Sequence, residues 1–182
     1  MYYLRTLALS FGLITIGQAA TFYSASLSGS QEFPTNLSSA TGFAILSITG
    51  NTLAVNLNWS GLVVPASAAH IHCCIAPGAN VPIAVGLPDF PSATSGTYLQ
   101  NFNLLDLAIY SPAFRAGLTA AQAEAKLIAG LDSGLAYVNI HNRTFSNGEI
   151  RGNLLPVPEP ASIALCAAGM LGLVGFGRRR AA

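Results

Sequence analysis

Apolar and polar residues alternate with a period of two along much of the chain. In residues 51–61 (NTLAVNLNWSG) every second residue is apolar, and these residues are Leu53, Val55, Leu57 and Trp59. Successive side chains of a β-strand point to opposite faces, so this alternation predicts a strand that is buried on one face only. Residues 41–49 (TGFAILSIT) predict a second strand, and Gly50-Asn51 between the two predicts a tight hairpin turn.

Further short segments have the composition of strands and are bounded by Gly, Pro or Asn: residues 21–29, 68–73, 82–87, 96–104, 135–141 and 148–155. One helix is predicted over residues 118–130, where Thr119 and Gln122 form a capping box and Gly130 ends the helix. Many short strands separated by turn residues are typical of antiparallel β-folds. The sequence therefore predicts an all-β, antiparallel Greek-key β-sandwich with one short helix.

The N-terminus departs from this pattern. A positive charge at Arg5 precedes an apolar run from Leu7 to Ile16, and small residues follow the run. This order of charge, apolar run and small residues is typical of a secretory signal peptide. We therefore expect residues 1–20 to be a signal peptide that is cleaved near Ala19 or Ala20.

The C-terminus is a second apolar segment. Ala161 to Phe176 carry no charge, and as a helix they would span about 24 Å, short of a hydrocarbon core of about 30 Å. The extended PVPEP segment precedes this short transmembrane helix, and the arginines that follow would hold its end on the cytoplasmic side. The domain before the helix would then lie outside the membrane, in agreement with the signal peptide.

Residues 156–182 resemble a PEP-CTERM sorting signal. The parts that carry the resemblance are the Pro-Glu-Pro motif, the short apolar span and the arginine cluster: Pro158, Glu159, Pro160, Arg178, Arg179 and Arg180. The resemblance implies recognition and cleavage by an exosortase of a Gram-negative bacterium, with transient membrane insertion through the C-terminal helix. It also implies a link to exopolysaccharide or biofilm matrix. A permanent anchor remains the alternative, because local thinning of the bilayer tolerates a short span.

Composition agrees with export. Only 8% of the 182 residues are charged, against about 25% in an ordinary soluble domain. The region between the two ends has no basic patch, which argues against a nucleic-acid partner. Residues 21–155 are long enough for one domain with its own core.

This central region resembles the CHRD domain. Three segments carry the resemblance in order: SLSGSQEFPTNLSSATGFAILSI, AAHIHCCIAPGANVPIAVGL and SGLAYVNIHNRTFSNGEIRGNL, within Ser24–Leu154. The chain departs from the family at Cys73-Cys74-Ile75, where a Gly-Pro turn is usual. The resemblance implies a β-sandwich module without established catalytic activity, so we do not expect an enzyme.

The three histidines lie in two of the predicted strands. His70 and His72 are two residues apart and share one face, about 7 Å apart, and His141 ends another strand. If the strands pair, three imidazoles converge in the manner of a Zn²⁺ or Cu²⁺ site, with Cys74 as the best additional ligand. The alternative is a structural cluster of neutral imidazoles that bond to Asn139, Tyr137 or backbone groups, with no cofactor.

The neighbouring cysteines are not expected to form a disulfide. Across a trans peptide their Cα atoms lie about 3.8 Å apart, whereas a disulfide joins Cα atoms about 4.4–6.8 Å apart. On a straight strand, moreover, Cys73 would face the core and Cys74 the histidine face.

The few charges of the domain are expected to pair with one another. The sequence predicts a structural ion-pair network of Glu32, Arg143, Glu149 and Arg151. A polysaccharide hydrolase that uses two of these carboxylates, Glu32 and Glu149, is a weaker alternative, because nothing in the sequence fixes their separation. No phosphate-binding loop or nucleophile elbow is present in the sequence.

Two functions follow from these patterns. The first is an exported, non-catalytic surface or matrix module that self-associates or binds extracellular polysaccharide through polar strand residues such as Asn56, Asn58 and Ser60. The second is a Zn- or Cu-binding or redox protein that uses the three histidines.

Overall fold

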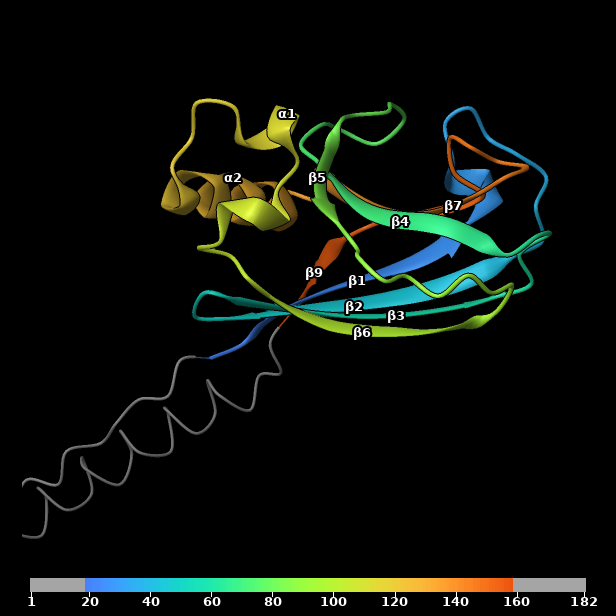
Figure 1. The fold of residues 1–182 in the computed structure, drawn as a ribbon, viewed down its shortest axis with the longest axis horizontal. Coiled ribbons are helices and arrows are strands. Elements are labelled where there is room, and N and C mark those ends of the chain that lie inside the picture. The colour runs from blue at the N-terminus through green and yellow to red at the C-terminus, as the bar shows by residue number, and fades with distance from the viewer. Residues whose placement is uncertain (1–18, 159–182) are drawn as a thin grey trace, which may run out of the picture.

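The computed structural model describes residues 19–158 (Figure 1). The described part is mostly β, with strands β1 (Thr21–Ser28), β2 (Thr41–Thr49), β3 (Thr52–Ser60), β4 (Ala66–Cys73), β5 (Ile83–Gly86), β6 (Gly96–Asn103), β7 (Ala136–Asn142), β8 (Ile150–Asn153) and β9 (Leu155–Val157). The helices are α1 (Pro112–Arg115) and α2 (Ala120–Asp132), and short 3₁₀ turns occupy Gly29–Gln31 and Leu107–Ile109. Every strand predicted from the alternation is present.

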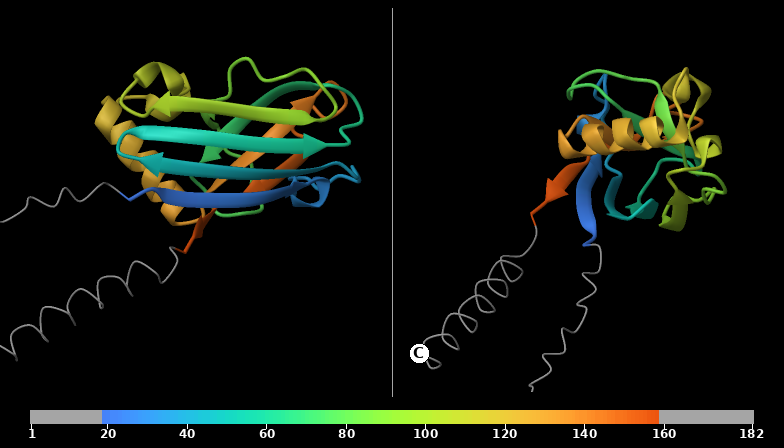
Figure 2. Two further views of the ribbon diagram at one scale, coloured as in Figure 1. Left: turned by 90° about the horizontal axis from the view of Figure 1, so that it is seen from below. Right: turned by 90° about the vertical axis from the view of Figure 1, so that its left-hand side faces the viewer.

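The strands form one antiparallel sheet in the order β5-β4-β7-β8-β1-β2-β3-β6, with β9 paired to β1. The sheet curls, so that β4, β5 and β7 lie over β1, β2, β3 and β6 as a second layer (Figure 1). Figure 2 shows α2 across one end of these layers. The antiparallel all-β class is confirmed; the Greek-key sandwich stays a prediction, because hydrogen bonds join both layers into a single sheet.

The core fills the space between the layers. The apolar face of β3 is buried as predicted, with Leu53, Val55, Leu57 and Trp59 at most 4% exposed. The hairpin is also confirmed, because Thr49 pairs with Thr52 across the two-residue turn and Gly50 has a φ of 56°. Such a left-handed conformation favours glycine.

Helix α2 begins as predicted and ends later. The Thr119 hydroxyl accepts from the Gln122 amide, and the Gln122 side chain accepts from the Thr119 amide, so the capping box is confirmed. The predicted end at Gly130 is wrong, because the helix continues to Asp132 and the left-handed glycine is Gly134, with a φ of 66°. Gly130 instead lies where α2 approaches the two cysteines.

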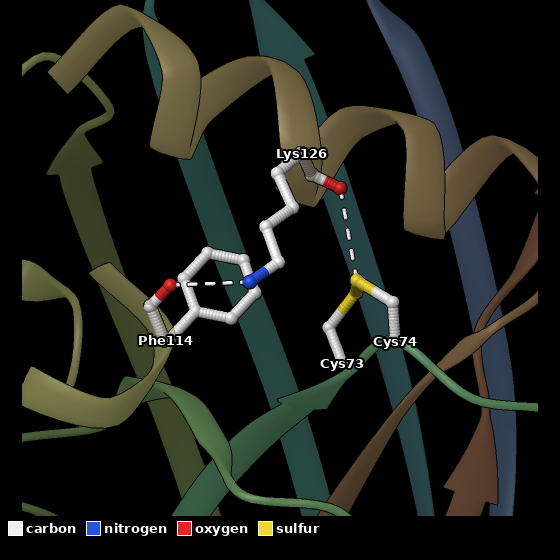
Figure 3. Close-up of a disulfide and its surroundings, with 4 residues drawn as sticks. All are labelled: Cys73, Cys74, Phe114 and Lys126. Atoms are coloured by element: carbon white, nitrogen blue, oxygen red, sulfur yellow. Dashed lines mark hydrogen bonds between the residues drawn. A yellow bond between two sulfur atoms is a disulfide. The ribbon is translucent and has the colours of Figure 1, made fainter. Parts of the chain in front are cut away.

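The expectation of separate cysteines is wrong. Cys73 and Cys74 form a disulfide at the end of β4 (Figure 3). The expectation assumed the straight backbone of an ideal strand, whereas β4 ends at Cys73 and the Cys73–Cys74 peptide bond is cis. Both sulfurs lie against Gly130 of α2, so the two side chains do not divide between the faces of the strand, although Cys73 is buried as expected.

The predicted signal peptide and sorting signal lie outside the described residues, apart from residues 19–20 and 156–158. Among residues 19–158 no helix has the length and apolar character of a membrane span. Phe22 pairs with Val157, so the beginning of β1 and the end of β9 lie side by side. Both terminal segments therefore join the domain at the same end.

Candidate metal centre

The outward face of β4, β7 and β8 is buried although its residues are polar. Tyr137, Asn139 and Arg151 point away from the core between the layers, yet each is at most 3% exposed. Groups from the neighbouring loops contact these strands, including the carbonyls of Val81 and Ser146. An ordinary polar strand face is exposed to solvent, so a polar face that loops cover is a candidate functional site.

The three histidines meet on this face. His70 and His72 lie on β4, and His141 lies on the adjacent strand β7, where it pairs with Ala68. One nitrogen from each imidazole can be chosen so that all three lie within 4.8 Å of one another. The predicted convergence is therefore confirmed as geometry.

Two backbone carbonyls determine where the imidazole protons reside. His72 Nδ1 lies 2.6 Å from the carbonyl oxygen of Val81, and His141 Nδ1 lies 2.9 Å from that of Ser146. A carbonyl oxygen only accepts hydrogen bonds, so in both neutral rings Nδ1 carries the proton and donates it. The lone pairs of His72 and His141 consequently lie on Nε2, the atom through which each ring could bind a metal ion.

The third imidazole completes the cluster. His70 Nδ1 lies 3.0 Å from His141 Nε2, which accepts the hydrogen bond from His70. This separation is close to the roughly 3.3 Å between two nitrogens on a tetrahedral ion with bonds of about 2.0–2.1 Å. His72 Nε2 is buried without a well-formed hydrogen bond, although the Asn139 side chain lies close enough to act on the His72 pKa. A bound cation would give this nitrogen a full partner.

The surroundings keep the three imidazoles neutral. Burial lowers the pKa of His70 to about 4, and the neighbouring imidazoles His141 and His72 act in the same direction. Burial is also the main cause that lowers the pKa values of His72 and His141, against the raising effect of their backbone hydrogen bonds. At neutral pH all three rings therefore keep a lone pair for a metal ion.

An aromatic and cationic stack supports His72 from the side. Its ring is parallel to that of Tyr137, with centroids 4.6 Å apart, and the Arg151 guanidinium carbon lies 3.8 Å from the Tyr137 centroid. Arg151 also donates to Asn80 Oδ1 at 3.0 Å. Loop 75–82 therefore holds the site through both Asn80 and the Val81 carbonyl.

A buried polar cluster adjoins this stack. The buried side-chain atoms of residues 19–158 that lack a hydrogen-bond partner are Glu32 Oε1, His72 Nε2, Asn139 Oδ1 and Arg151 Nε. Burial raises the pKa of Glu32 to about 7, while the positive charge of Arg151 acts to lower it. Gly148, with a φ of 125°, lies against the side chains of Glu32 and Asn139, where a Cβ would overlap both.

Cys74 does not join the histidines. Its Sγ is bonded to Cys73 and lies 3.7 Å from the carbonyl oxygen of Lys126 on α2. The predicted additional ligand is therefore wrong for this structure, because the strand ends at Cys73 and the chain turns toward the helix.

No ion pair joins any two of the four residues of the predicted network, all of which the structure describes, although the charge of Arg151 acts on the pKa of Glu32. Glu149 is fully buried, but it accepts hydrogen bonds from the Ser38 hydroxyl, the Val63 amide and the Asn142 side chain. Arg143 is exposed, and Arg151 contacts Tyr137 and Asn80. Neutral donors satisfy Glu149 in place of the predicted cations, because short segments from distant parts of the sequence reach it.

No pattern in the sequence indicates the groups that orient the imidazoles. The carbonyls of Val81 and Ser146 belong to loops, and any residue type supplies a carbonyl. The Asn-x-His alternation of β7 did identify Tyr137 and Asn139 as neighbours on the histidine face. The contact between Tyr137 and His72 is a ring stack, however, rather than the hydrogen bond that was considered.

Comparison with family models agrees with this architecture. A model of the CHRD domain matches residues 23–154, which include every strand that carries the site. The chain belongs to the CHRD domain family. A model of the PEP-CTERM protein-sorting motif matches residues 156–181, immediately after the CHRD domain. A comparison with curated proteins finds no match.

The two matches together indicate where the protein is located and how it is processed. The sorting motif indicates a bacterial protein that is exported to the cell envelope or surface and processed by an exosortase.

Because Ser28 pairs with Arg151 while Phe22 pairs with Val157, the arginine lies about 20 Å along β1 from the end where the sorting motif begins. The CHRD domain therefore carries its histidine face at a distance from that end.

Proposed function

We propose that the mature protein is a non-catalytic, surface-exposed module that binds one transition-metal ion through His70, His72 and His141. The observation that supports the proposal most strongly is the pair of Nε2 lone pairs fixed by the Val81 and Ser146 carbonyls. Without a metal ion, His72 Nε2 is buried with only the Asn139 side chain beside it and no well-formed hydrogen bond. Metal binding gives that atom a partner.

The donor set favours zinc or copper. Three neutral imidazoles are typical of Zn²⁺ and Cu²⁺ sites, whereas Ca²⁺ and Mg²⁺ require oxygen ligands. His70 would contribute the nitrogen that now donates to His141, after its proton moves to the other ring nitrogen. A fourth position would remain for water or another exogenous ligand.

A matrix role at the surface of a Gram-negative bacterium is the second candidate function. It is supported by the outward face of β2, β3 and β6, where Ile45 and Leu99 are 39% and 67% exposed next to the exposed amide of Asn56. Mixed amide and aliphatic groups on an open face suit contact with polysaccharide or with another copy of the chain. The metal site and this face lie on different layers of the sheet, so the two roles are compatible.

The experiment is metal analysis of the processed protein recovered from the cell envelope, without added metal. We expect about one zinc or copper ion per chain in the wild type and a loss of that ion in His72→Ala. Asn56→Ala, on the opposite outer face, is the matched control and keeps the ion. Wild-type protein that folds but neither carries nor takes up either metal would overturn the proposal.

A further inference from the structure

The Cys73–Cys74 disulfide lies directly after the metal-site strand and under α2 (Figure 3). Cys73 is 5% exposed, and Cys74 is partly exposed. Both line a cavity of about 250 Å³ together with Val81, Pro82 and Lys126. The disulfide is thus buried on one side and open to a small cavity on the other.

Helix α2 packs closely against the sulfurs at Gly130. A Cβ placed on Gly130 would overlap the Sγ atoms of Cys73 and Cys74. Bonded sulfurs lie about 2.05 Å apart, whereas unbonded atoms require roughly 3.5 Å or more. Two thiols therefore need more space than the disulfide, and that space comes from a sulfur turning into the cavity beside Val81, or from a shift of α2 or of the end of β4.

Such a shift would reach the metal site through two short connections. His72 directly precedes Cys73 in β4. Val81, whose carbonyl fixes the His72 proton on Nδ1, lines the same cavity as the two cysteines. A change in sulfur separation thus acts on both the backbone of His72 and the group that orients its ring.

We propose that Cys73–Cys74 is a thiol–disulfide exchange site that controls metal affinity, an inference that rests on the proposed metal function. The oxidised protein holds the ion, and reduction by a dithiol weakens its binding. A thiolate of the dithiol attacks Sγ of Cys74, the more exposed of the two residues, and the S–S bond breaks with Cys73 as the leaving thiolate. The second thiol of the reductant then resolves the mixed disulfide.

The exchange balances without any group of the protein being consumed. Two electrons and two protons pass from the dithiol to the cysteines, giving two thiols and a cyclic disulfide of the reductant. Lys126 lines the cavity, where its ammonium lies 4.2 Å from the Phe114 centroid and donates to the Phe114 carbonyl at 3.2 Å. A positive charge thus lies in the cavity that the two cysteines line. The Lys126 carbonyl, 3.7 Å from Cys74 Sγ, would accept a hydrogen bond from the new thiol.

The test compares Zn²⁺ affinity in the two oxidation states of the processed protein. Half of the sample is reduced with dithiothreitol and freed of reagent without air, and intact mass confirms the gain of two hydrogen atoms. Both halves are then titrated with Zn²⁺ against a chromophoric chelator. We expect affinity about 10–100-fold lower after reduction, the range typical of disturbed outer-shell groups. Reoxidation should restore it.

Two variants make the result specific. Cys74→Ser cannot form the disulfide, so it should show the low affinity at once and no response to dithiothreitol. His72→Ala, reduced in the same way, measures any Zn²⁺ held by the thiols alone. Circular dichroism verifies that each sample is folded.

The outcomes separate the two proposals. Equal Zn²⁺ affinity of folded oxidised and reduced protein would overturn the exchange site and leave the metal site standing. Two free thiols in the protein isolated from the cell envelope, with no disulfide formed on oxidation, would also overturn it. Absence of Zn²⁺ and Cu²⁺ binding in the oxidised protein would contradict the proposed function itself.

Discussion

The two layers of the sheet present their outward faces to very different surroundings. On β3 the outward residues Asn56 and Asn58 are exposed, while on β7 the outward residues Tyr137 and Asn139 are almost completely buried. Both strands direct their other face into the same core. A strand needs only one buried face to fold, so the second buried face of β7 has another use.

Loops account for the difference. Segments 29–36, 75–82 and 143–148 contact the outward face of β4, β7 and β8, and they bring carbonyls and the side chains of Asn80 and Glu32 with them. The face of β3 has no such cover among the described residues, apart from bonds between neighbouring polar side chains such as Thr97 and Asn58. Burial of polar groups costs free energy unless they are paired, so the covered face is the more costly one to build.

The largest expected effect tests whether both layers share one core. Leu57→Ala on β3 and Ile140→Ala on β7 each remove a fully buried side chain, and we expect each to lower the free energy of unfolding by about 2–5 kcal/mol. Urea unfolding followed by circular dichroism measures both. A cost below about 1 kcal/mol for either variant would mean that its layer does not contribute to a common core.

The next prediction sets one asparagine against another. Asn139→Ala removes a buried amide and leaves the polar groups around it without that hydrogen-bonding partner. We therefore expect the free energy of unfolding to fall by about 1–3 kcal/mol. Asn56→Ala, at the exposed position, should change stability by less than about 0.5 kcal/mol. Similar effects for the two variants, measured by the same urea unfolding, would erase the distinction between the faces.

The smallest expected effect is the pH dependence of the stability of the metal-free protein. The lowered histidine pKa values mean that unfolded chains bind more protons below about pH 6.5, so these groups reduce stability as pH falls toward 4. The raised pKa of Glu32 acts in the opposite sense, because the folded protein binds the extra proton between about pH 4.5 and 7. Its contribution to stability is lost as pH rises through that window.

Glu32→Gln separates these opposing contributions. Without the carboxyl, stability should fall more steeply between pH 7 and pH 5 than it does in the wild type, and the variant should be at least as stable as the wild type at pH 8. Urea unfolding at several pH values measures both curves. Parallel curves would show that Glu32 titrates alike in folded and unfolded chains.

Sequence reasoning succeeded where local periodicity determines the structure. The apolar face of β3 and the shared face of His70 and His72 both follow from alternation alone. The meeting of His141 with these histidines required only that β4 and β7 be neighbours. These features depend on the path of single strands and on one pairing.

The errors arise where distant segments meet. Glu149 accepts hydrogen bonds from Ser38, Val63 and Asn142, and no local pattern in the sequence predicts this combination. Gly130 lies inside α2, where the helix approaches the cysteines closely. A rule that uses glycine only to mark helix ends therefore predicts the wrong role for it. The prediction for the cysteine pair depends on an ideal strand, whereas β4 ends at Cys73 in the structure.

The most direct measurement of the central claim is an anomalous difference map from crystals of the processed protein, collected at the zinc and copper absorption edges. The account predicts one peak on the outward face of β4 and β7, about 2.0–2.1 Å from a nitrogen of each of His70, His72 and His141. Crystals grown with added zinc and copper that show the three imidazoles hydrogen-bonded to one another, with no anomalous peak between them, would contradict it.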